Sequence, residues 1–235
     1  MRNILSNKWR PECFDDFTGQ TEVVYSLKNI LKNKYIPRAF LISGSYGVGK
    51  TSLARVLVKC LNCEIGITCA PCGNCYCCTS IINLTNPDSI EVDAASKTKL
   101  ENTKEIILSS EYKSFKNRFR TYIFDECHML SLSSFNFLLK ILEEENNNNI
   151  YILVTTNINK VPDTIKSRCV SLHMKRLSIY DIKSRVNYIL NVEQIKIEDN
   201  MLDKIIFFSH SNLRAIMNTL EKFSGYKNIS DDRLN

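Results

Sequence analysis

The chain has 235 residues, of which 44% are hydrophobic, and a formal net charge of +6. This length and composition predict a soluble protein with one main domain and a small appendage. The sequence shows neither an apolar leader nor a run of about 18 apolar residues. We therefore expect a cytoplasmic protein without a membrane span, in which thiols stay reduced. The positive charge suits a polyanionic partner, but the basic residues are scattered, so a solvated basic surface explains them equally well.

The first motif is a glycine-rich loop between a strand predicted at 39–43 and a helix predicted at 52–57. Residues 44–51 match G-x-x-x-x-G-K-[ST] at every fixed position. Backbone N–H groups of such a loop turn toward phosphate oxygens, and the helix N-terminus adds partial positive charge. The lysine reaches the β- and γ-phosphates of ATP, and the hydroxyl ligates Mg²⁺. The expected ATP-binding residues are Gly44, Ser45, Tyr46, Gly47, Val48, Gly49, Lys50, Thr51 and Ser52.

A cysteine cluster follows, with six of the ten cysteines in the stretch 63–78. In a reducing compartment this density favours a metal over disulfides. Two C-x₂-C pairs and the first cysteine of the cluster make a four-thiolate set suited to a closed, structural Zn²⁺ site. Its members are Cys63, Cys72, Cys75 and Cys78. Spacing alone does not exclude Cys69 and Cys77 as ligands, and an iron–sulfur cluster is the alternative.

Apolar strand candidates alternate with helical patterns, which predicts a parallel sheet with helices on both faces. These candidates span 39–43, 89–92, 121–124 and 150–155. The third is followed by Asp125 and Glu126. After a buried strand, Asp125 is suited to hold the Mg²⁺ shell through water, and Glu126 to orient and deprotonate an attacking water. The alternative for this pair is a solvated turn.

Polar residues at three later positions are candidates for contact with the γ-phosphate. Thr156, or else Thr155, follows the fourth strand and either reports hydrolysis by a hydrogen bond or simply ends the strand. Arg168 lies in a Ser-Arg-Cys sequence, and Arg214 opens the last predicted helix. Each arginine is a surface charge or a phosphate ligand, and the residues alone leave both readings open. The histidines, His128 among them, have no partners at metal-ligand spacing and are interpreted as structural or surface residues.

Strand signals stop at Ser178, which with Asp181 forms a helix-start box. An amphipathic helix is predicted earlier, over 132–142. The later helices are predicted at 179–190, 201–208 and 213–223. We therefore predict an ATPase domain at 1–177 with a zinc module at 63–78, a helical lid domain at 178–225 and a tail at 226–235.

Taken together, these residues resemble the gamma/tau subunit family of bacterial DNA polymerase III, the AAA+ motors of the sliding-clamp loader. The resemblance runs from Lys8 to about Phe223. Its motifs are Lys8-Trp9-Arg10-Pro11, Phe17-Thr18-Gly19-Gln20, Gly44 to Thr51, Leu61-Asn62-Cys63, Asp93-Ala94-Ala95-Ser96, Asp125 to Leu130, Leu138-Leu139-Lys140 with Leu142-Glu143-Glu144, and Ser167-Arg168-Cys169.

The resemblance implies an AAA+ P-loop NTPase of the α/β class, with a parallel sheet, a zinc-binding insert and a small C-terminal helical lid. It assigns the zinc ligands to the four-cysteine set named above and leaves Cys69 and Cys77 as non-ligands. It also implies that Arg168 acts as a finger on a neighbouring subunit's ATP and that Arg214 is a second sensor.

The implied function is an ATPase, with ATP, Mg²⁺ and Zn²⁺ as ligands, that loads the sliding clamp onto primer–template DNA. Its implied partners are sister loader subunits in a hetero-oligomer, the clamp, and DNA read through its backbone. It would be a subunit of a DNA-directed DNA polymerase holoenzyme, a nucleotidyltransferase, without holding the polymerase active site. Lys97 and Lys99 are candidate DNA phosphate contacts, or else part of a solvated loop.

The chain departs from the family in three ways. The family usually has a glycine just before the second-sensor sequence, and Ser211-Asn212-Leu213-Arg214 contains none. The prolines expected after the Leu-Glu-Glu motif are replaced by Glu145 and asparagines, and the chain stops at Asn235, before the collar domain expected of the family. Two other functions remain. A branch-migration helicase or similar AAA+ remodeller is disfavoured by the cysteine module and the Ser-Arg-Cys sequence. A non-hydrolysing scaffold subunit of the same loader is disfavoured by the intact phosphate loop and its carboxylates.

Overall fold

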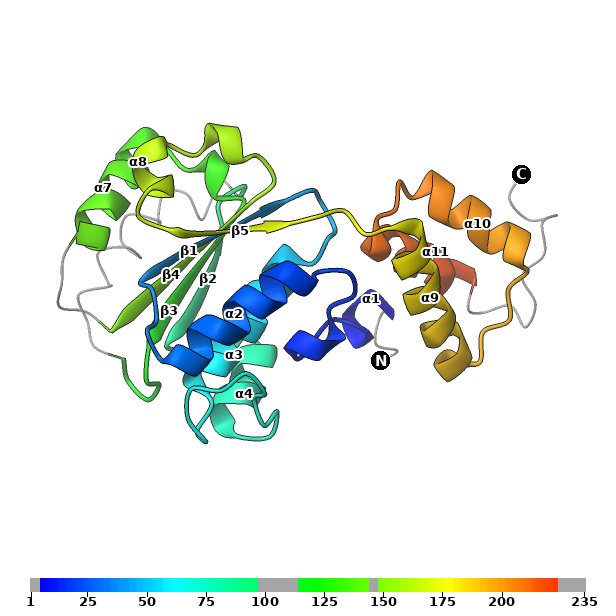
Figure 1. Ribbon diagram of the computed structural model, residues 1–235, viewed down its shortest axis with the longest axis horizontal. Coiled ribbons are helices and arrows are strands. Elements are labelled where there is room, and N and C mark those ends of the chain that lie inside the picture. Colours follow the sequence, from blue (N-terminus) through cyan, green and yellow to red (C-terminus); the bar gives the residue numbers. More distant parts are fainter. Residues whose placement is uncertain (1–4, 97–113, 144–147, 224–235) are drawn as a thin grey trace.

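The structure is a computed structural model that describes residues 5–96, 114–143 and 148–223. At its centre lies a parallel sheet of five strands in the order β2-β3-β4-β1-β5 (Figure 1). The strands are β1 (Ala39–Gly44), β2 (Ser89–Asp93), β3 (Arg120–Asp125), β4 (Asn149–Thr155) and β5 (Val170–Met174). In the pairing of β1 with β4, Phe40 lies opposite Ile152 and Ile42 opposite Val154. The predicted α/β class with a parallel sheet is therefore confirmed.

The strand β5 was not among the strands predicted from the sequence. It lies at the edge of the sheet, where Leu172 and Met174 are buried while Ser171 and His173 are exposed. The central strands β1 and β4 are buried along their whole length and read as continuous apolar runs. A short edge strand with alternating polar residues gives a weaker signal, which explains the omission.

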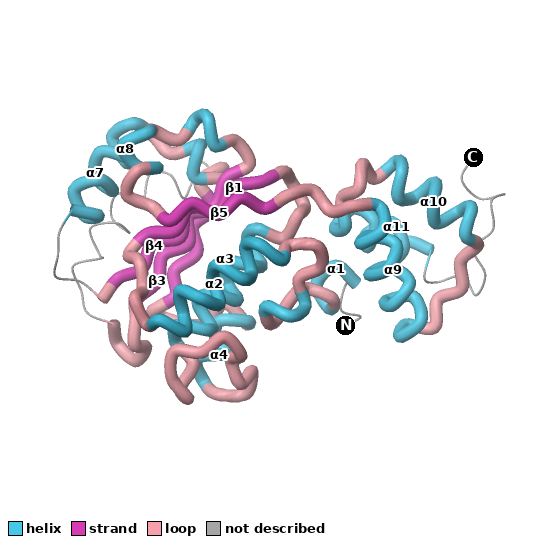
Figure 2. The backbone as a smooth tube through the Cα atoms, viewed as in Figure 1, coloured by secondary structure: helices cyan, strands magenta, loops and turns pink. Residues whose placement is uncertain are grey.

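Helices cover both faces of the sheet (Figures 1 and 2). One face carries α2 (Thr21–Asn33) and α3 (Lys50–Asn62), and the other carries α7 (Leu132–Glu143) and α8 (Asp163–Lys166). Successive residues of a strand point to opposite faces. In β1, Phe40 and Ile42 therefore join the core under α2 and α3, and Leu41 joins the core under α7. The helix predicted at 132–142 is confirmed as α7. Short 3₁₀ helices are η1 (Phe14–Asp16), η3 (Cys127–Met129) and η4 (Ile158–Lys160).

The cysteine-rich insert follows α3 directly. Cys63 lies one residue beyond the end of α3, and the short helix α4 (Tyr76–Ile82) closes the insert. A neighbouring segment fixes this end of α3: Arg118 Nη1 donates to the Leu61 carbonyl at 2.7 Å, and the N–H of Phe119 donates to Asn62 Oδ1 at 2.8 Å. The insert is thus attached to a rigid helix that begins at the phosphate loop.

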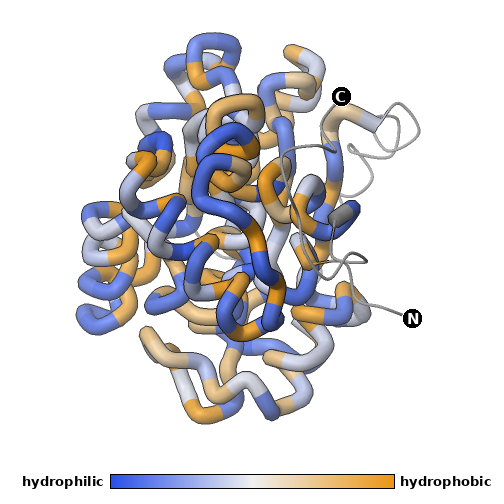
Figure 3. Tube along the Cα trace, turned by 90° about the vertical axis from the view of Figure 1, so that its right-hand side faces the viewer, coloured by the Kyte–Doolittle hydropathy of each residue, from blue (hydrophilic) through white to orange (hydrophobic). Residues whose placement is uncertain are grey.

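The C-terminal helices form a separate bundle, as predicted. Its members are α9 (Ile179–Glu193), α10 (Asp199–Phe208) and α11 (Leu213–Phe223), with the short N-terminal helix α1 (Leu5–Lys8) packed against them. Their inward faces share one cluster that includes Ile182, Val186, Ile205, Ile216 and Leu220. Hydrophobic and hydrophilic residues are interspersed along the helices, as expected for amphipathic helices with one apolar face (Figure 3).

The boundaries at 177 and 225 stay predictions, and the predicted tail at 226–235 lies outside the described residues. Within the ranges that the structure describes, no helix has both the length and the apolar character needed to cross a membrane.

Candidate functional site

The phosphate loop connects β1 to α3 through glycines in the left-handed region of the backbone. Gly47 has φ +78° and Gly49, which caps α3, has φ +98°. A side chain at Gly47 would also collide with Asn212, the residue that precedes α11. Both positions therefore require glycine for their backbone conformation, and Gly47 also requires it because there is no space for a side chain. The loop is built as its sequence predicts, and the lid approaches it closely.

Lys50 and Thr51 begin α3 with their side chains turned inward. Lys50 is 6% exposed, its Nζ donates to the carbonyl of Ser45 at 2.9 Å, and burial lowers the pKa of its ammonium. Thr51 Oγ1 donates to Oδ2 of Asp125 at 2.7 Å. Burial raises the pKa of Asp125, while the hydrogen bond from Thr51 lowers it. A buried ammonium and a half-buried carboxyl group thus lie at the loop, contributed by two elements.

The sheet order explains why Asp125 meets the loop. β3 and β1 flank β4, and the carboxyl ends of parallel strands share one edge of a sheet. The residues after β4 therefore lie between the loop and the acidic pair. Thr156 occupies this place: its Oγ1 donates to Oε2 of Glu126 at 2.7 Å, and its N–H reaches the same oxygen at 3.2 Å. The structure thus puts Thr156, and not Thr155, beside Glu126.

A cleft of about 200 Å³ lies over the phosphate loop. It is bounded by the loop, Asp125 and Glu126 on one side and by Arg214 of the lid on the other. The N-terminal segment supplies a wall that sequence reasoning did not assign to the site, including Trp9 and Arg10. The only sequence signal for these residues was their place in the Lys-Trp-Arg-Pro motif.

Arg10 ties that wall to the first turn of α3. Its Nε donates to Oγ of Ser52 at 3.0 Å. Burial lowers the pKa of the Arg10 guanidinium, and the nearby cations Arg55 and Arg214 add to this effect. A cluster of cations at a cleft above a glycine-rich loop suits a polyphosphate ligand.

Arg168 does not line the cleft of its own chain. It lies just after α8, where Nη2 pairs with Glu143 Oε1 at 2.6 Å and Nη1 donates to the Thr164 carbonyl at 2.9 Å. Its side chain is 38% exposed. Lys97 and Lys99, the candidate DNA contacts, lie outside the described residues.

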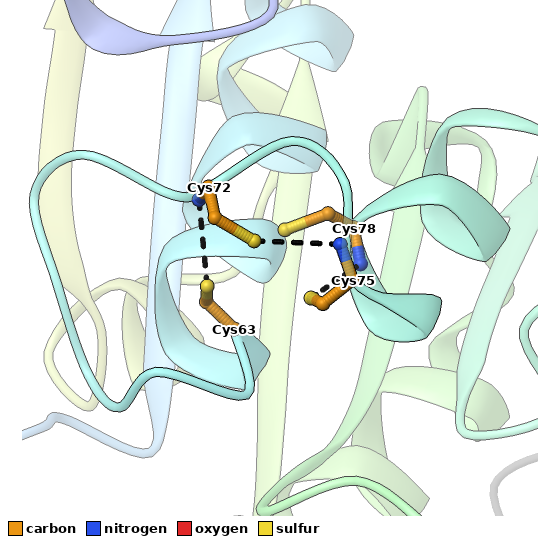
Figure 4. Close-up of side chains that lie close together, drawn as sticks. All are labelled: Cys63, Cys72, Cys75 and Cys78. Carbon is orange, nitrogen blue, oxygen red and sulfur yellow. Dashed lines mark hydrogen bonds between the residues drawn. The ribbon is translucent and has the colours of Figure 1, made fainter.

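Four cysteines of the insert converge on one point (Figure 4). The sulfur atoms of Cys63, Cys72, Cys75 and Cys78 all lie within 4.8 Å of one another. Zn–S bonds of about 2.3 Å in a tetrahedron correspond to sulfur separations of about 3.8 Å. The set therefore fits one tetrahedral ion after a small contraction.

Backbone donors favour the thiolate form of Cys72, whereas burial raises the pKa of Cys78. The N–H of Cys75 donates to Sγ of Cys72 and the N–H of Cys78 donates to Sγ of Cys75, both at 3.4 Å. The hydrogen bonds from the backbone lower the pKa of Cys72 to about 7, with that of Cys75 contributing most. Stabilised thiolates are the form in which cysteine binds a metal.

The remaining cysteines of the cluster point elsewhere. Sγ of Cys77 donates to Asn117 Oδ1 at 3.1 Å in a buried contact, and Sγ of Cys69 donates to the Lys28 carbonyl at 3.4 Å. The tertiary structure thus separates the two cysteines that spacing alone left open. The metal-ligand geometry supports the set of four.

Comparisons with known proteins show to which family the chain belongs. The family model described as "DNA polymerase III, delta subunit" matches residues 19–178. The chain is 43% identical over 219 residues to the tau subunit of DNA polymerase III from Escherichia coli, covering 93% of this chain and 34% of that protein. It is 43% identical over 218 residues to the gamma subunit from Buchnera aphidicola subsp. Acyrthosiphon pisum, covering 93% of this chain and 60% of that protein.

A solved structure shares the fold. The Holliday junction branch migration motor RuvB of Thermotoga maritima superposes with a TM-score of 0.66 at 20% identity, covering 97% of this chain and 69% of that one. The chain thus shares the α/β fold of that structure, and it spans about a third to three fifths of the DNA polymerase III relatives named above. Because the family model covers more than half of the chain, the chain belongs to the family of DNA polymerase III subunits that the model describes, and its sequence resembles gamma and tau subunits.

Proposed function

We propose that this chain is the ATP-hydrolysing motor of a clamp loader, placing a sliding clamp on primer–template DNA. The observation that carries this proposal is the arrangement at the sheet edge. The Thr51 hydroxyl lies 2.7 Å from Asp125, and Glu126 lies next along the chain, with its carboxylate held by Thr156. A hydroxyl, two carboxylates and a phosphate loop are the parts that phosphoryl transfer to water requires.

Each residue of the site has a separate task. Lys50 would exchange its hydrogen bond with Ser45 for the β- and γ-phosphates, which restores a charged partner to a buried ammonium. Mg²⁺, when bound, would neutralise charge on these phosphates, with Thr51 and Asp125 holding it through hard oxygen atoms. Glu126 would orient and deprotonate the attacking water, and Thr156 would fix that carboxylate.

We assign the two arginines to ATP molecules bound by different chains. Arg214 lines the cleft of its own chain, so it would contact the γ-phosphate and couple the lid to the nucleotide. Arg168 lies on the surface beside Glu143, so it would reach ATP only in a neighbouring subunit. The four-cysteine site would hold a structural Zn²⁺, because no ligand position is left open for a reacting group.

The names of the relatives support the proposal of a multi-subunit assembly. Proteins named as DNA polymerase III subunits are members of an assembly, so sister subunits, the clamp and DNA are the proposed partners in a hetero-oligomer. DNA would be bound through its backbone, and the protein would work in the cytoplasm.

The deciding experiment is ATP turnover by the purified chain with Mg²⁺, alone and with sister subunits, clamp and primer–template DNA. Stimulation by primed DNA and clamp together supports a loader. ATP binding without turnover in every mixture would favour the scaffold alternative, and stimulation by four-way junctions instead would favour a RuvB-like motor. Lys50→Ala is the matched control for contaminating ATPase.

A further inference from the structure

His128 lies next to the acidic pair, in the 3₁₀ turn η3 that directly follows Glu126. Its Nδ1 atom is 3.1 Å from Oγ1 of Thr155 and 3.3 Å from Oε2 of Glu126. The side chain is 12% exposed. The sequence suggested only a structural or surface role for His128. In the structure its ring lies beside Glu126, the proposed general base.

The neighbouring atoms favour one tautomer of this ring. The hydroxyl of Thr155 can accept from Nδ1 or donate to it, so the carboxylate charge on Oε2 of Glu126 decides between the tautomers. A bare Nδ1 would direct its lone pair toward that charge. A proton on Nδ1 instead faces the carboxylate, and Oγ1 of Thr155 can then accept from it, which favours the Nδ1–H form.

The contacts of Glu126 are concentrated on one of its oxygens. Oε2 faces the hydroxyl and the N–H of Thr156 as well as Nδ1 of His128, and Glu126 itself lines the cleft. Among the residues described, no hydrogen bond is made to Oε1. One oxygen is thus anchored while the other is available to a water.

Anchoring matters here because the backbone of Glu126 is strained. Its φ is +50°, in the left-handed region that side-chain-bearing residues rarely adopt. The turn needs outside contacts to hold the carboxylate in one place. His128 and Thr156 approach from two elements, η3 and the end of β4, and fix its orientation together.

We infer that His128 is a positioning residue for Glu126: its Nδ1–H, held by Thr155 and 3.3 Å from Oε2, keeps that oxygen in place so that Oε1 meets the attacking water. The inference rests on the proposed function. It requires no proton transfer by His128 during turnover, only a fixed hydrogen-bond donor. A base misplaced by about 1 Å can lose about a hundredfold in rate.

The test compares two substitutions. His128→Phe keeps a ring but removes the donor, and we expect kcat to fall about tenfold or more with KM and nucleotide affinity unchanged. His128→Asn keeps an N–H near the position of Nδ1, so it should recover most of the rate. In a Glu126→Gln background, His128→Phe should cause no further loss, since the group it positions is gone. His173→Phe, which removes another imidazole with an Nδ1 contact, to Ser43 at 3.0 Å, should leave kcat unchanged.

Equal losses in His128→Phe and His128→Asn, an additive loss in the Glu126→Gln background, or a His128→Phe rate within twofold of the parent would overturn the inference. Thermal unfolding and nucleotide binding check that the variants are folded. A ¹⁵N spectrum of neutral His128 gives a readout that does not depend on turnover. Protonation at Nδ1 supports the inference, and protonation at Nε2 contradicts it. A parent chain without turnover, alone or with partners, refutes the proposed function separately.

Discussion

Thr51 and Asp125 are joined by a hydrogen bond of 2.7 Å, although they lie 74 positions apart in the sequence. Thr51 begins the helix after the phosphate loop, and Asp125 ends a strand that is not a neighbour of β1. Burial raises the pKa of Asp125, so the threonine hydroxyl compensates part of the cost of its charge. The hydrogen bond therefore connects the phosphate-loop helix to the end of β3.

The acidic pair allows binding and chemistry to be separated. Glu126→Gln should keep ATP affinity but slow turnover by about a hundredfold or more, because the water loses its base. Lys50→Ala should weaken ATP binding itself, because the phosphates lose their buried cation. Equilibrium nucleotide binding and phosphate release measure the two effects. Hydrolysis by the Glu126→Gln chain at the parent rate would remove Glu126 from its proposed role.

The cysteine insert should contain one zinc ion per chain. Cys72→Ser or Cys75→Ser should abolish metal binding and destabilise the insert, because structural zinc contributes about 10–16 kcal/mol of binding free energy in small domains. Cys77→Ser is the matched control and should retain zinc, because Sγ of Cys77 bonds to Asn117. Metal analysis of each purified variant measures the zinc content. Loss of zinc when Cys77 is the only cysteine replaced would contradict the ligand set.

Arg168 should act on ATP held by another chain. Arginine fingers raise rates by about 10³–10⁵ where measured, so Arg168→Ala should slow turnover without changing ATP affinity. Lys50→Ala chains still present Arg168, and mixing them with Arg168→Ala chains should restore hydrolysis. Lys166→Ala, which removes a neighbouring surface cation paired with Asp163, should have no effect. Turnover by Arg168→Ala at the parent rate in every mixture would identify Arg168 as a surface charge.

Ser211 occupies a backbone conformation that suits glycine, with φ +58° just before α11. A residue with a side chain costs about 1 kcal/mol there. Ser211→Gly should therefore stabilise the lid by up to about 1 kcal/mol, less the added freedom of the unfolded chain. Ser209→Gly is the control, since Ser209 has φ −81° and should only lose stability. Hydrogen exchange of the α11 amides measures the effect of both substitutions. Exchange should become slower in Ser211→Gly but not in Ser209→Gly.

Glu193 should make the attachment of the N-terminal segment sensitive to acid. The hydrogen bond from Lys8 and that from Trp9 Nε1, at 2.7 Å, lower the pKa of Glu193 below its ordinary value of 4.5. The stabilisation is therefore present above the unfolded pKa and lost as the pH falls through the folded pKa. Trp9 is the single tryptophan of the chain. Its fluorescence should change through this acidic range, and the change should shrink in Glu193→Gln. The same transition in both proteins would disprove the link.

Several parts of the site are properties of local sequence. The phosphate loop is recognised from residues 44–51 because glycine conformation and the strand-loop-helix order are set by neighbours along the chain. The apolar runs of β1 and β4 predict central strands for the same reason, since a strand buried on both faces has no polar face to obscure it.

Other parts depended on packing between distant segments. Spacing left Cys69 and Cys77 open as ligands, and only the fold turns their sulfurs toward Lys28 and Asn117. The sequence likewise left Thr155 and Thr156 both open, and the structure places Thr156, the residue directly after β4, beside Glu126.

The contact of Arg10 with Ser52 depends on packing of the N-terminal segment against α3. His128 is only two residues from Glu126, but its role was not evident from the sequence, because the conformation of the turn after β3 and the contact with Thr155 decide where its ring lies. The sequence by itself determined the phosphate loop, the acidic pair and the cysteine cluster, because each is encoded by residues close along the chain. The tertiary structure decided which side chains meet them, because those contacts depend on strand order and on the approach of the lid.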